Sequence, residues 1–184
     1  MESIDSIRGI EGIAANLYFQ SLSHLTLDFE FTCRSKRPPL DEVNALLSYG
    51  YFVLFNLLQS LIITAGLNPY FGLYHRDSKD HAALVSDMME EWRAIIVDSS
   101  VISLIRKRMI SKTHFQQGKD KGIYLNKEGV SIVSNFIKQK LVKNKYHDTF
   151  SQISLLAMIE KQVRSLVSAI RKGNLCALWS PKFR

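Results

Sequence analysis

Apolar residues recur at steps of three and four along most of this chain of 184 residues. Near the N-terminus, Ile7, Ile10, Ala14 and Leu17 follow these steps, which place them on one face of a helix. No convincing run of alternating apolar and polar residues, the sign of a strand, interrupts the pattern. The periodicity predicts an all-α fold, with helices at about 5–24, 41–66, 80–110, 127–143 and 148–172.

The longest apolar run is residues 49–67, "YGYFVLFNLLQSLIITAGL". Asn56, Gln59 and Ser60 interrupt it, and Pro69 follows it. Because the composition, 46% apolar and 22% charged, is ordinary for a globular protein, we interpret this run as the buried central helix of a multi-helix bundle. A membrane-embedded helix is the alternative. The N-terminus lacks the apolar stretch of a signal peptide, so we expect a cytoplasmic protein with no membrane partner.

The length fits one α-helical domain over residues 1–184. Pro38 and Pro39 close an extended segment at 27–39, and the polar, glycine-containing stretch 111–126 is predicted to be a mobile loop. The two cysteines, Cys33 and Cys176, lie far apart and indicate neither a zinc site nor a disulfide framework.

Charge divides the chain into two halves. Residues 1–100 carry seven Lys or Arg against thirteen Asp or Glu, whereas residues 101–184 carry seventeen against four. We therefore expect an acidic, metal-binding half at about 1–110 and a basic, DNA-contacting half at about 111–184. The basic groups that could contact DNA phosphate begin at Arg106, just before the basic half. These groups are Arg106, Lys107, Arg108, Lys138, Lys140, Lys143, Lys145, Arg164, Arg171 and Lys172. Lysine-rich helices that are merely soluble are the alternative.

Three carboxylates lie in unusual surroundings. Glu11 stands beside an apolar helix face, where an unpaired charge is costly, although it could turn outward or pair with Arg8. Asp87 and Glu90 are three residues apart and share one helix face, where they would repel each other unless a cation lay between them. A solvated acidic edge paired with Arg93 explains the same spacing.

His75 follows a turn shaped by glycine and proline in "GLNPYFGLYHRD". A lone histidine is more often structural than a metal ligand. If it is a ligand, carboxylate oxygens with one imidazole suit Mg²⁺ or Mn²⁺ better than zinc. Such a site beside a basic surface fits phosphodiester chemistry, in which a metal polarises the phosphate and activates a hydroxyl nucleophile.

Four ordered blocks carry a specific resemblance: "RGIEGIAANLYF", "RPPLDEVNALLSYGY", "GLNPYFGLYHRD" and "SDMMEEWR". Together they resemble the CRISPR-associated protein 1 family, metal-dependent integrases that insert new spacers into CRISPR arrays. The later stretches "YLNKEGVSIVSNFIKQKL" and "IEKQVRSLVSAIRKG" are also similar. The resemblance implies that this chain corresponds to the family's all-α C-terminal catalytic domain, without its β-rich N-terminal domain.

The resemblance also implies roles for particular residues. It makes Glu11, His75 and Glu90 the catalytic ligands of Mg²⁺ or Mn²⁺, with Asp87, Asn44 and Arg93 supporting them. The implied activity is metal-dependent DNA endonuclease and integrase chemistry, in which a DNA 3′-hydroxyl attacks a phosphodiester. The implied partners are donor spacer and CRISPR repeat DNA, a second copy of the chain, and CRISPR-associated protein 2. A non-catalytic DNA-binding or scaffold module that keeps the fold is the alternative.

Overall fold

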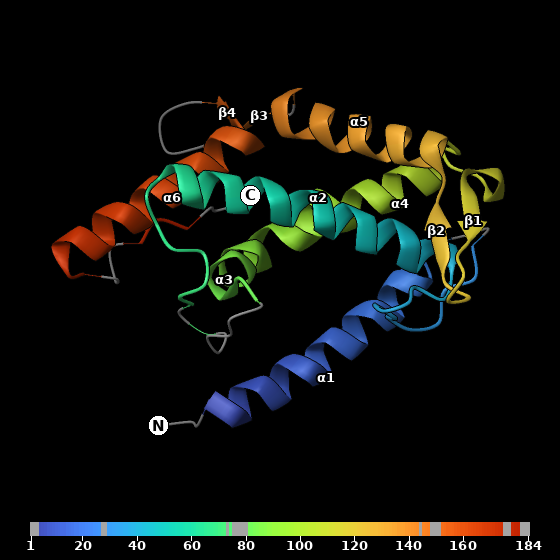
Figure 1. The fold of residues 1–184 in the computed structure, drawn as a ribbon, viewed down its shortest axis with the longest axis horizontal. Helices are drawn as coiled ribbons and strands as arrows, with labels where there is room; N and C mark the ends of the chain where they lie inside the picture. The colour runs from blue at the N-terminus through green and yellow to red at the C-terminus, as the bar shows by residue number, and fades with distance from the viewer. Residues whose placement is uncertain are drawn as a thin grey trace. The chain divides into compact units, whose positions relative to one another are not determined.

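The computed structural model describes residues 4–26, 29–72, 74, 81–143, 145–147, 152–174 and 178–180, and Figure 1 shows its elements as a ribbon. Within these residues the main elements are six α-helices and two small hairpins. The predicted all-α class is therefore confirmed. Helices predicted at 5–24, 41–66 and 127–143 are found at α1 (Ile4–Ser23), α2 (Glu42–Thr64) and α5 (Lys127–Lys143).

The helix predicted at 80–110 consists of three parts. They are α3 (Ala83–Trp92), a π-helical turn η1 (Arg93–Asp98) and α4 (Ser99–Arg106). The hydroxyl groups of Ser99 and Ser100 donate to the carbonyls of Ile95 and Ile96, inside the π-helical turn. π-Turns inside α-helices occur often at functional sites, and this one begins three residues after Glu90.

Two hairpins correct the sequence prediction. The stretch 111–126, predicted to be a loop, forms a short 3-10 turn η2 (Lys112–His114) and paired strands β1 (Phe115–Gln117) and β2 (Ile123–Leu125). The helix predicted at 148–172 is α6 (Leu155–Lys172), preceded by paired strands β3 (Lys145–His147) and β4 (Gln152–Ser154). Strands of three residues are too short for alternation to be visible in the sequence.

The chain divides into two compact units, and each combines a segment of the acidic half with one of the basic half. Unit 1 comprises residues 1–49 and 101–133, and unit 2 comprises residues 50–100 and 134–184. In unit 1, buried side chains of the start of α2 and of α4 form the core, among them Leu46, Leu47 and Leu104. The β1–β2 hairpin is held in this unit by Ile123, whose N–H donates to the carbonyl of Pro39 at 2.8 Å.

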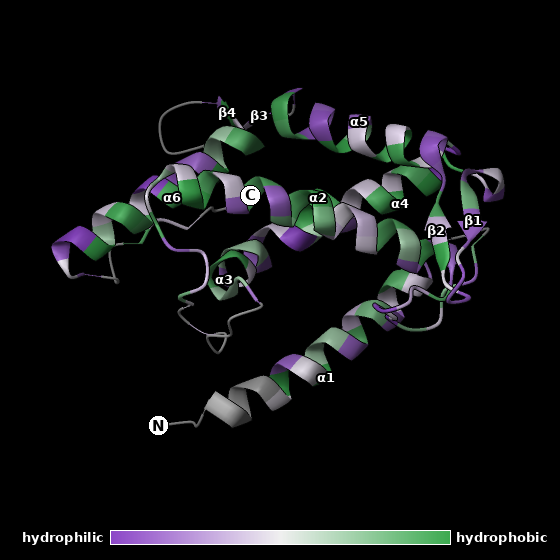
Figure 2. Cartoon of the chain, viewed as in Figure 1, coloured by the Kyte–Doolittle hydropathy of each residue, from purple (hydrophilic) through white to green (hydrophobic). Residues whose placement is uncertain are grey.

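In unit 2, the core is formed by the second part of α2, α3 with its π-helical turn, the end of α5, and one face of α6. Figure 2 shows hydrophobic and hydrophilic residues alternating along α6, as expected for a helix with one buried side. Its buried residues are Leu155, Met158, Ile159, Gln162, Val163, Leu166 and Ala169. Ser154 caps the N-terminus of α6, because its hydroxyl oxygen accepts from the N–H of Ala157 at 3.2 Å.

α2 is buried along one side. Leu46, Leu54, Leu58 and Ile62 are inaccessible or nearly so, whereas Phe52 is 61% exposed. Among the described helices, α2 alone is long and apolar enough to cross a membrane by length and composition, and 33% of its most apolar window is buried. Core helices of globular proteins meet the same criterion.

Candidate active site

The acidic face of α3 holds the backbone that leads to His75. The Oδ2 atom of Asp87 accepts a hydrogen bond from the N–H of Tyr74 at 2.9 Å. His75 itself lies outside the described residues, but its chain neighbour is fastened to α3 one turn before Glu90. Asp87 thus links two parts of the candidate site that the sequence separates by twelve residues.

Glu90 is paired with the first residue of the π-helical turn. The Nη1 atom of Arg93 lies 2.8 Å from Oε1 and 2.9 Å from Oε2 of Glu90. The ion pair that the spacing allowed is therefore present, with the side chains of Arg93 and Glu90 32% and 37% exposed. The guanidinium carbon of Arg93 also lies 5.7 Å from the centroid of the Tyr51 ring, within the range of a cation–π contact.

Tyr51 is held in turn by a buried carboxylate that sequence reasoning did not single out. The Tyr51 hydroxyl donates to Oδ1 of Asp98 at 2.6 Å, and Asp98 is 2% exposed. Lys140, on α5, donates to the hydroxyl of Ser99, the residue after Asp98. Burial lowers the pKa of Lys140, and the charge of Asp98 opposes that shift. This predicted phosphate-binding lysine therefore points its ammonium group into unit 2.

Glu91 has a structural role that the sequence did not suggest. Its carboxylate accepts from the side-chain amide of Gln162 on α6 and from the hydroxyl of Ser180 at 3.0 Å. The Oε1 atom of Gln162 accepts from the indole N–H of Trp92 at 2.7 Å. Trp92 and Gln162 are 0% and 3% exposed, so these contacts fix the register of α3 from its inner side.

Asn44 is a buried residue at the start of α2 with all its polar atoms engaged. Its Oδ1 atom accepts from Nη1 of Arg34 at 2.8 Å and from the N–H of Ser35 at 2.9 Å. Its amide nitrogen donates to the carbonyl of Cys33 at 2.9 Å and to Asp41 at 2.6 Å. Burial raises the pKa of the Asp41 carboxyl, against the hydrogen bonds from Asn44 and the charge of Arg34. Asn44 therefore joins the extended segment to α2.

Glu11 lies on α1, where the described side chains from Gly9 to Tyr18 are all exposed. Arg8, its possible partner from the sequence, has a side chain outside the described residues. Among the described residues of unit 2, no three His, Cys, Asp or Glu side chains gather. Since Glu11 belongs to unit 1 and His75 is not described, the convergence of Glu11, His75 and Glu90 stays a prediction.

The donor set nevertheless fits a hard divalent ion. Glu90 and Glu11 both expose carboxylate oxygens, the ligand atoms that Mg²⁺ and Mn²⁺ prefer. The Glu90 carboxylate already contacts one cation, the guanidinium of Arg93, so a positive group can be bound at this position. Asp87 brings the residue next to a candidate imidazole ligand to the same helix.

Most of the predicted DNA-contacting residues are exposed. At the end of α4, Arg106, Lys107 and Arg108 are exposed, and so are Lys138, Lys143 and Lys145. On α6 and after it, Arg164, Arg171 and Lys172 are exposed, and Arg164 lies 3.6 Å from Glu160. Exposure leaves these side chains accessible to phosphate, whereas Lys140 is half-buried.

The sequence profile of the family described as CRISPR associated protein Cas1 matches residues 1–139. A CRISPR-associated endonuclease Cas1 from Methanospirillum hungatei is 41% identical over 180 residues, covering 94% of this chain and 52% of the relative. One from Mycobacterium tuberculosis is 34% identical over 180 residues, covering 94% of this chain and 52% of the relative. The chain thus spans about half the length of the curated relatives it matches.

Solved structures agree. A CAS1 protein from Thermotoga maritima has a TM-score of 0.84 and 26% identity, covering 99% of this chain and 56% of that one. A chain of a Cas6-RT-Cas1–Cas2 complex has a TM-score of 0.86 and 28% identity, covering 99% of this chain and 20% of that one. By sequence profile, by curated relatives and by fold, this chain belongs to the CRISPR associated protein Cas1 family.

Proposed function

We propose that this chain is the catalytic domain of a metal-dependent DNA nuclease and integrase that joins new spacer DNA into a CRISPR array. In this reaction a DNA 3′-hydroxyl attacks a phosphodiester, and water is the competing nucleophile. Relatives named as CRISPR-associated endonucleases, matched over most of this chain, support the proposal.

The observation that carries the proposal is the hydrogen bond between Asp87 and the N–H of Tyr74. It fastens the residue before His75 to the helix that bears Glu90, as a shared site requires. Asp87 is partly buried, and its carboxylate holds backbone that lies thirteen positions earlier in the chain. The contact is expected if the loop delivers a ligand.

We assign the metal to Glu11, His75 and Glu90, with Mg²⁺ or Mn²⁺ as the ion. When bound, the ion would act as a Lewis acid toward the phosphate and the attacking hydroxyl. Asp87 orients the backbone next to His75, and Arg93 neutralises Glu90 in the absence of the ion. Asn44 has a supporting role, because it fixes the start of α2 against the extended segment.

Exposed lysines and arginines would bind DNA through its phosphates, which gives affinity without sequence preference. We further propose that the protein acts in the cytoplasm as a homodimer, together with CRISPR-associated protein 2. Support for the last partner comes from the similar chain found in a complex whose name includes Cas1 and Cas2.

The test is cleavage and strand joining of branched DNA by the protein in the presence and absence of Mn²⁺. We expect activity that requires the ion and is lost in Glu11→Ala. A protein that binds the branched DNA but neither cuts nor joins it, with or without Mn²⁺, would favour the non-catalytic scaffold. A structure with Mn²⁺ bound would then show whether Glu11, His75 and Glu90 meet at one ion.

A further inference from the structure

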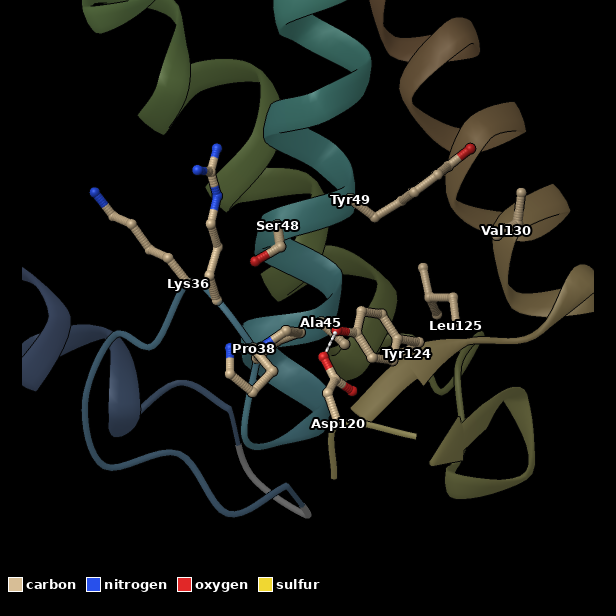
Figure 3. A pocket seen from close by; sticks show the side chains of 11 residues that line it. Lys36, Pro38, Ala45, Ser48, Tyr49, Asp120, Tyr124, Leu125 and Val130 are labelled. Carbon is tan, nitrogen blue, oxygen red and sulfur yellow. Dashed lines mark hydrogen bonds between the residues drawn. The ribbon is translucent and has the colours of Figure 1, made fainter. Parts of the chain in front are cut away.

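Two tyrosines donate a hydrogen bond to an aspartate at the same distance, 2.6 Å, but in different surroundings. In unit 1, Tyr124 of β2 bonds to Asp120, and Figure 3 shows this exposed pair in the wall of a groove. In unit 2, Tyr51 of α2 bonds to Asp98, which is 2% exposed. Because burial of a carboxylate is costly unless hydrogen bonds compensate for it, the buried pair restrains its ring more strongly.

The π-helical turn η1 brings Arg93 and Asp98 to the same tyrosine. Residues five apart point about 140° away from each other in an α-helix of about 3.6 residues per turn. In η1 the turn is wider, and the N–H of Ser99 donates to the carbonyl of Ala94, five residues earlier. Arg93 and Asp98, also five apart, both reach Tyr51. The guanidinium carbon of Arg93 lies 5.7 Å from the centroid of the ring, and Asp98 accepts from the hydroxyl.

A glycine lets α2 come close enough to η1 for these contacts. A Cβ atom at Gly50 would lie 2.5 Å from Cγ1 of Val97 and 3.7 Å from Cδ1 of Ile137. Gly50 precedes Tyr51 on α2, and Val97 precedes Asp98 on η1. The close approach of Gly50 to Val97 therefore sets the distance across which the Tyr51 hydroxyl meets its carboxylate.

The other end of Arg93 lies at the proposed metal ligand Glu90. The Nη1 atom of Arg93 lies 2.8 and 2.9 Å from the two carboxylate oxygens of Glu90. The Nε atom of Arg93 is buried and has no hydrogen-bond partner among the residues that the structure describes. The contacts described for this guanidinium are thus the Glu90 carboxylate and the Tyr51 ring. Loss of the ring would leave Arg93 free to turn away from Glu90.

We propose that Tyr51 and Asp98 are positioning residues that set the metal affinity of Glu90 through Arg93. The inference rests on the proposed function in taking Glu90 as a metal ligand. A guanidinium held at the carboxylate is a counter-ion that a divalent ion must displace, because two cations at the same oxygens repel each other. The more firmly the ring holds the guanidinium there, the weaker the ion binds. Asp98 acts one step further back, because its hydrogen bond fixes the ring.

The test is a double-mutant cycle, measured by calorimetric titration of Mn²⁺ in the absence of DNA. Tyr51→Leu removes the ring and should tighten Mn²⁺ binding about two- to fivefold, which corresponds to the loss of a cation–π contact of about 0.5–1 kcal/mol. In an Arg93→Gln background the same substitution should leave the Mn²⁺ affinity unchanged, because it acts through Arg93. A ring whose loss merely loosened the fold would change the affinity by the same factor in both backgrounds.

Two further variants separate the ring from its hydroxyl. Tyr51→Phe keeps the ring and loses the bond to Asp98, so it should tighten Mn²⁺ binding less than Tyr51→Leu does. If Tyr51→Phe binds Mn²⁺ like the wild type, Asp98 has no part in the positioning. Tyr124→Leu is the matched control, because it removes a tyrosine bonded to an aspartate at the same distance, and it should leave the Mn²⁺ affinity unchanged. Thermal unfolding of each variant checks that the fold is kept.

A second measurement needs no metal. In EDTA, the NMR signal of the buried Nε–H group of Arg93, identified by its absence in Arg93→Gln, should be shifted by the ring current of Tyr51. Tyr51→Leu should move this signal, whereas Tyr51→Phe should keep it near its wild-type position. Tyr124→Leu should leave it unchanged.

The inference is overturned if well-folded Tyr51→Leu binds Mn²⁺ like the wild type, or if it changes the affinity equally with and without Arg93. Failure of the proposed function has a different signature. Mn²⁺ binding that is the same in Glu90→Gln would remove Glu90 from the metal site, while a Tyr51-dependent Arg93 signal would still show that the ring positions Arg93. Mn²⁺ binding that requires Glu90 but ignores Tyr51 would keep the proposed function and remove the positioning.

Discussion

The two helices that carry the proposed carboxylate ligands differ in how they are supported. α3 has seven buried residues among its ten, and Trp92 at its end is 0% exposed. On α1 the apolar residues Ile13 and Leu17 are 66% and 60% exposed. Glu90 therefore stands on a helix whose register is fixed by a core, and Glu11 on a helix whose central turns are not buried.

The difference shows which side chains are held in a fixed direction by the fold. Around α3, buried polar contacts to α2 and α6 set the direction of each side chain: Tyr51 to Asp98, and Trp92 to Gln162. Such contacts are costly to break, because they leave buried groups without partners. The central turns of α1 around Glu11 are exposed, so we expect a bound metal to contribute more to the position of Glu11 than to that of Glu90.

The largest effect should come from the ligands themselves. Glu90→Gln and Glu11→Gln should each lower Mn²⁺-dependent cleavage more than about 100-fold, since loss of groups that merely orient ligands already costs about 10- to 100-fold. Cleavage rates on branched DNA measure this. Glu160→Gln, at a surface carboxylate near Arg164, is the control. If Glu90→Gln loses Mn²⁺-dependent cleavage and Glu11→Gln keeps it, α3 belongs to the active site and α1 does not.

Substitutions in the two helices should also differ in their effect on the free energy of unfolding. Trp92→Ala should lower the free energy of unfolding by about 3–5 kcal/mol, because it leaves a cavity and removes the indole N–H that donates to Oε1 of Gln162. Leu17→Ala, at an exposed position, should change it by less than about 0.5 kcal/mol. Denaturant unfolding measures both. A large loss of stability in Leu17→Ala would mean that this face of α1 is covered in solution. The two helices would then not differ in how they are supported.

Removing the cation next to Glu90 should strengthen metal binding. Arg93→Gln should tighten Mn²⁺ binding about three- to tenfold, because the ion no longer displaces a guanidinium and no longer meets its charge. Calorimetric titration of Mn²⁺ tests this. Arg164→Gln, which removes an exposed arginine beside Glu160, should leave the Mn²⁺ affinity unchanged. Weaker binding in Arg93→Gln would instead mean that Arg93 positions the Glu90 carboxylate for the ion.

A smaller effect should distinguish two lysines of α5 that differ in their surroundings. Lys138→Gln removes an exposed cation and should flatten the plot of log duplex affinity against log salt by about 0.7–0.9, if Lys138 contacts phosphate. Lys140→Gln should leave the slope unchanged, because its ammonium group is bound to Ser99 beside the π-helical turn. Equal slopes for the two variants would show that Lys140 turns outward to DNA.

The smallest expected effect is a pH dependence of stability from Lys140. Its pKa is lowered from 10.5 in the folded protein, so the unfolded chain binds more protons between the two values. Stability from this group should therefore rise as the pH increases through its lowered pKa toward 10.5. Chemical unfolding of wild type and Lys140→Met at several alkaline pH values measures it. The difference between the two proteins should change over that window and be constant below it.

The spacing of apolar residues was enough to predict where α1, α2 and α5 lie. Steps of three and four place α1 and α2 within two residues of their predicted ends, and α5 at its predicted ends. They also place Asp87, Glu90 and Arg93 on neighbouring faces, and the ion pair between Glu90 and Arg93 follows from that spacing. These features depend on residues within one or two turns, and a helix repeats the same geometry at every turn.

The remaining contacts depend on packing between segments that lie far apart in the sequence. The β1–β2 hairpin is fixed by a hydrogen bond from the N–H of Ile123 to the carbonyl of Pro39, and Glu91 accepts hydrogen bonds from Gln162 and Ser180. Tyr51 meets Asp98 across 47 positions of sequence, and Trp92 meets Gln162 across 70. Local periodicity indicates which face of a helix is apolar. Which polar group from a distant segment meets that face is set by packing, because a buried donor must find whichever acceptor the fold brings near it.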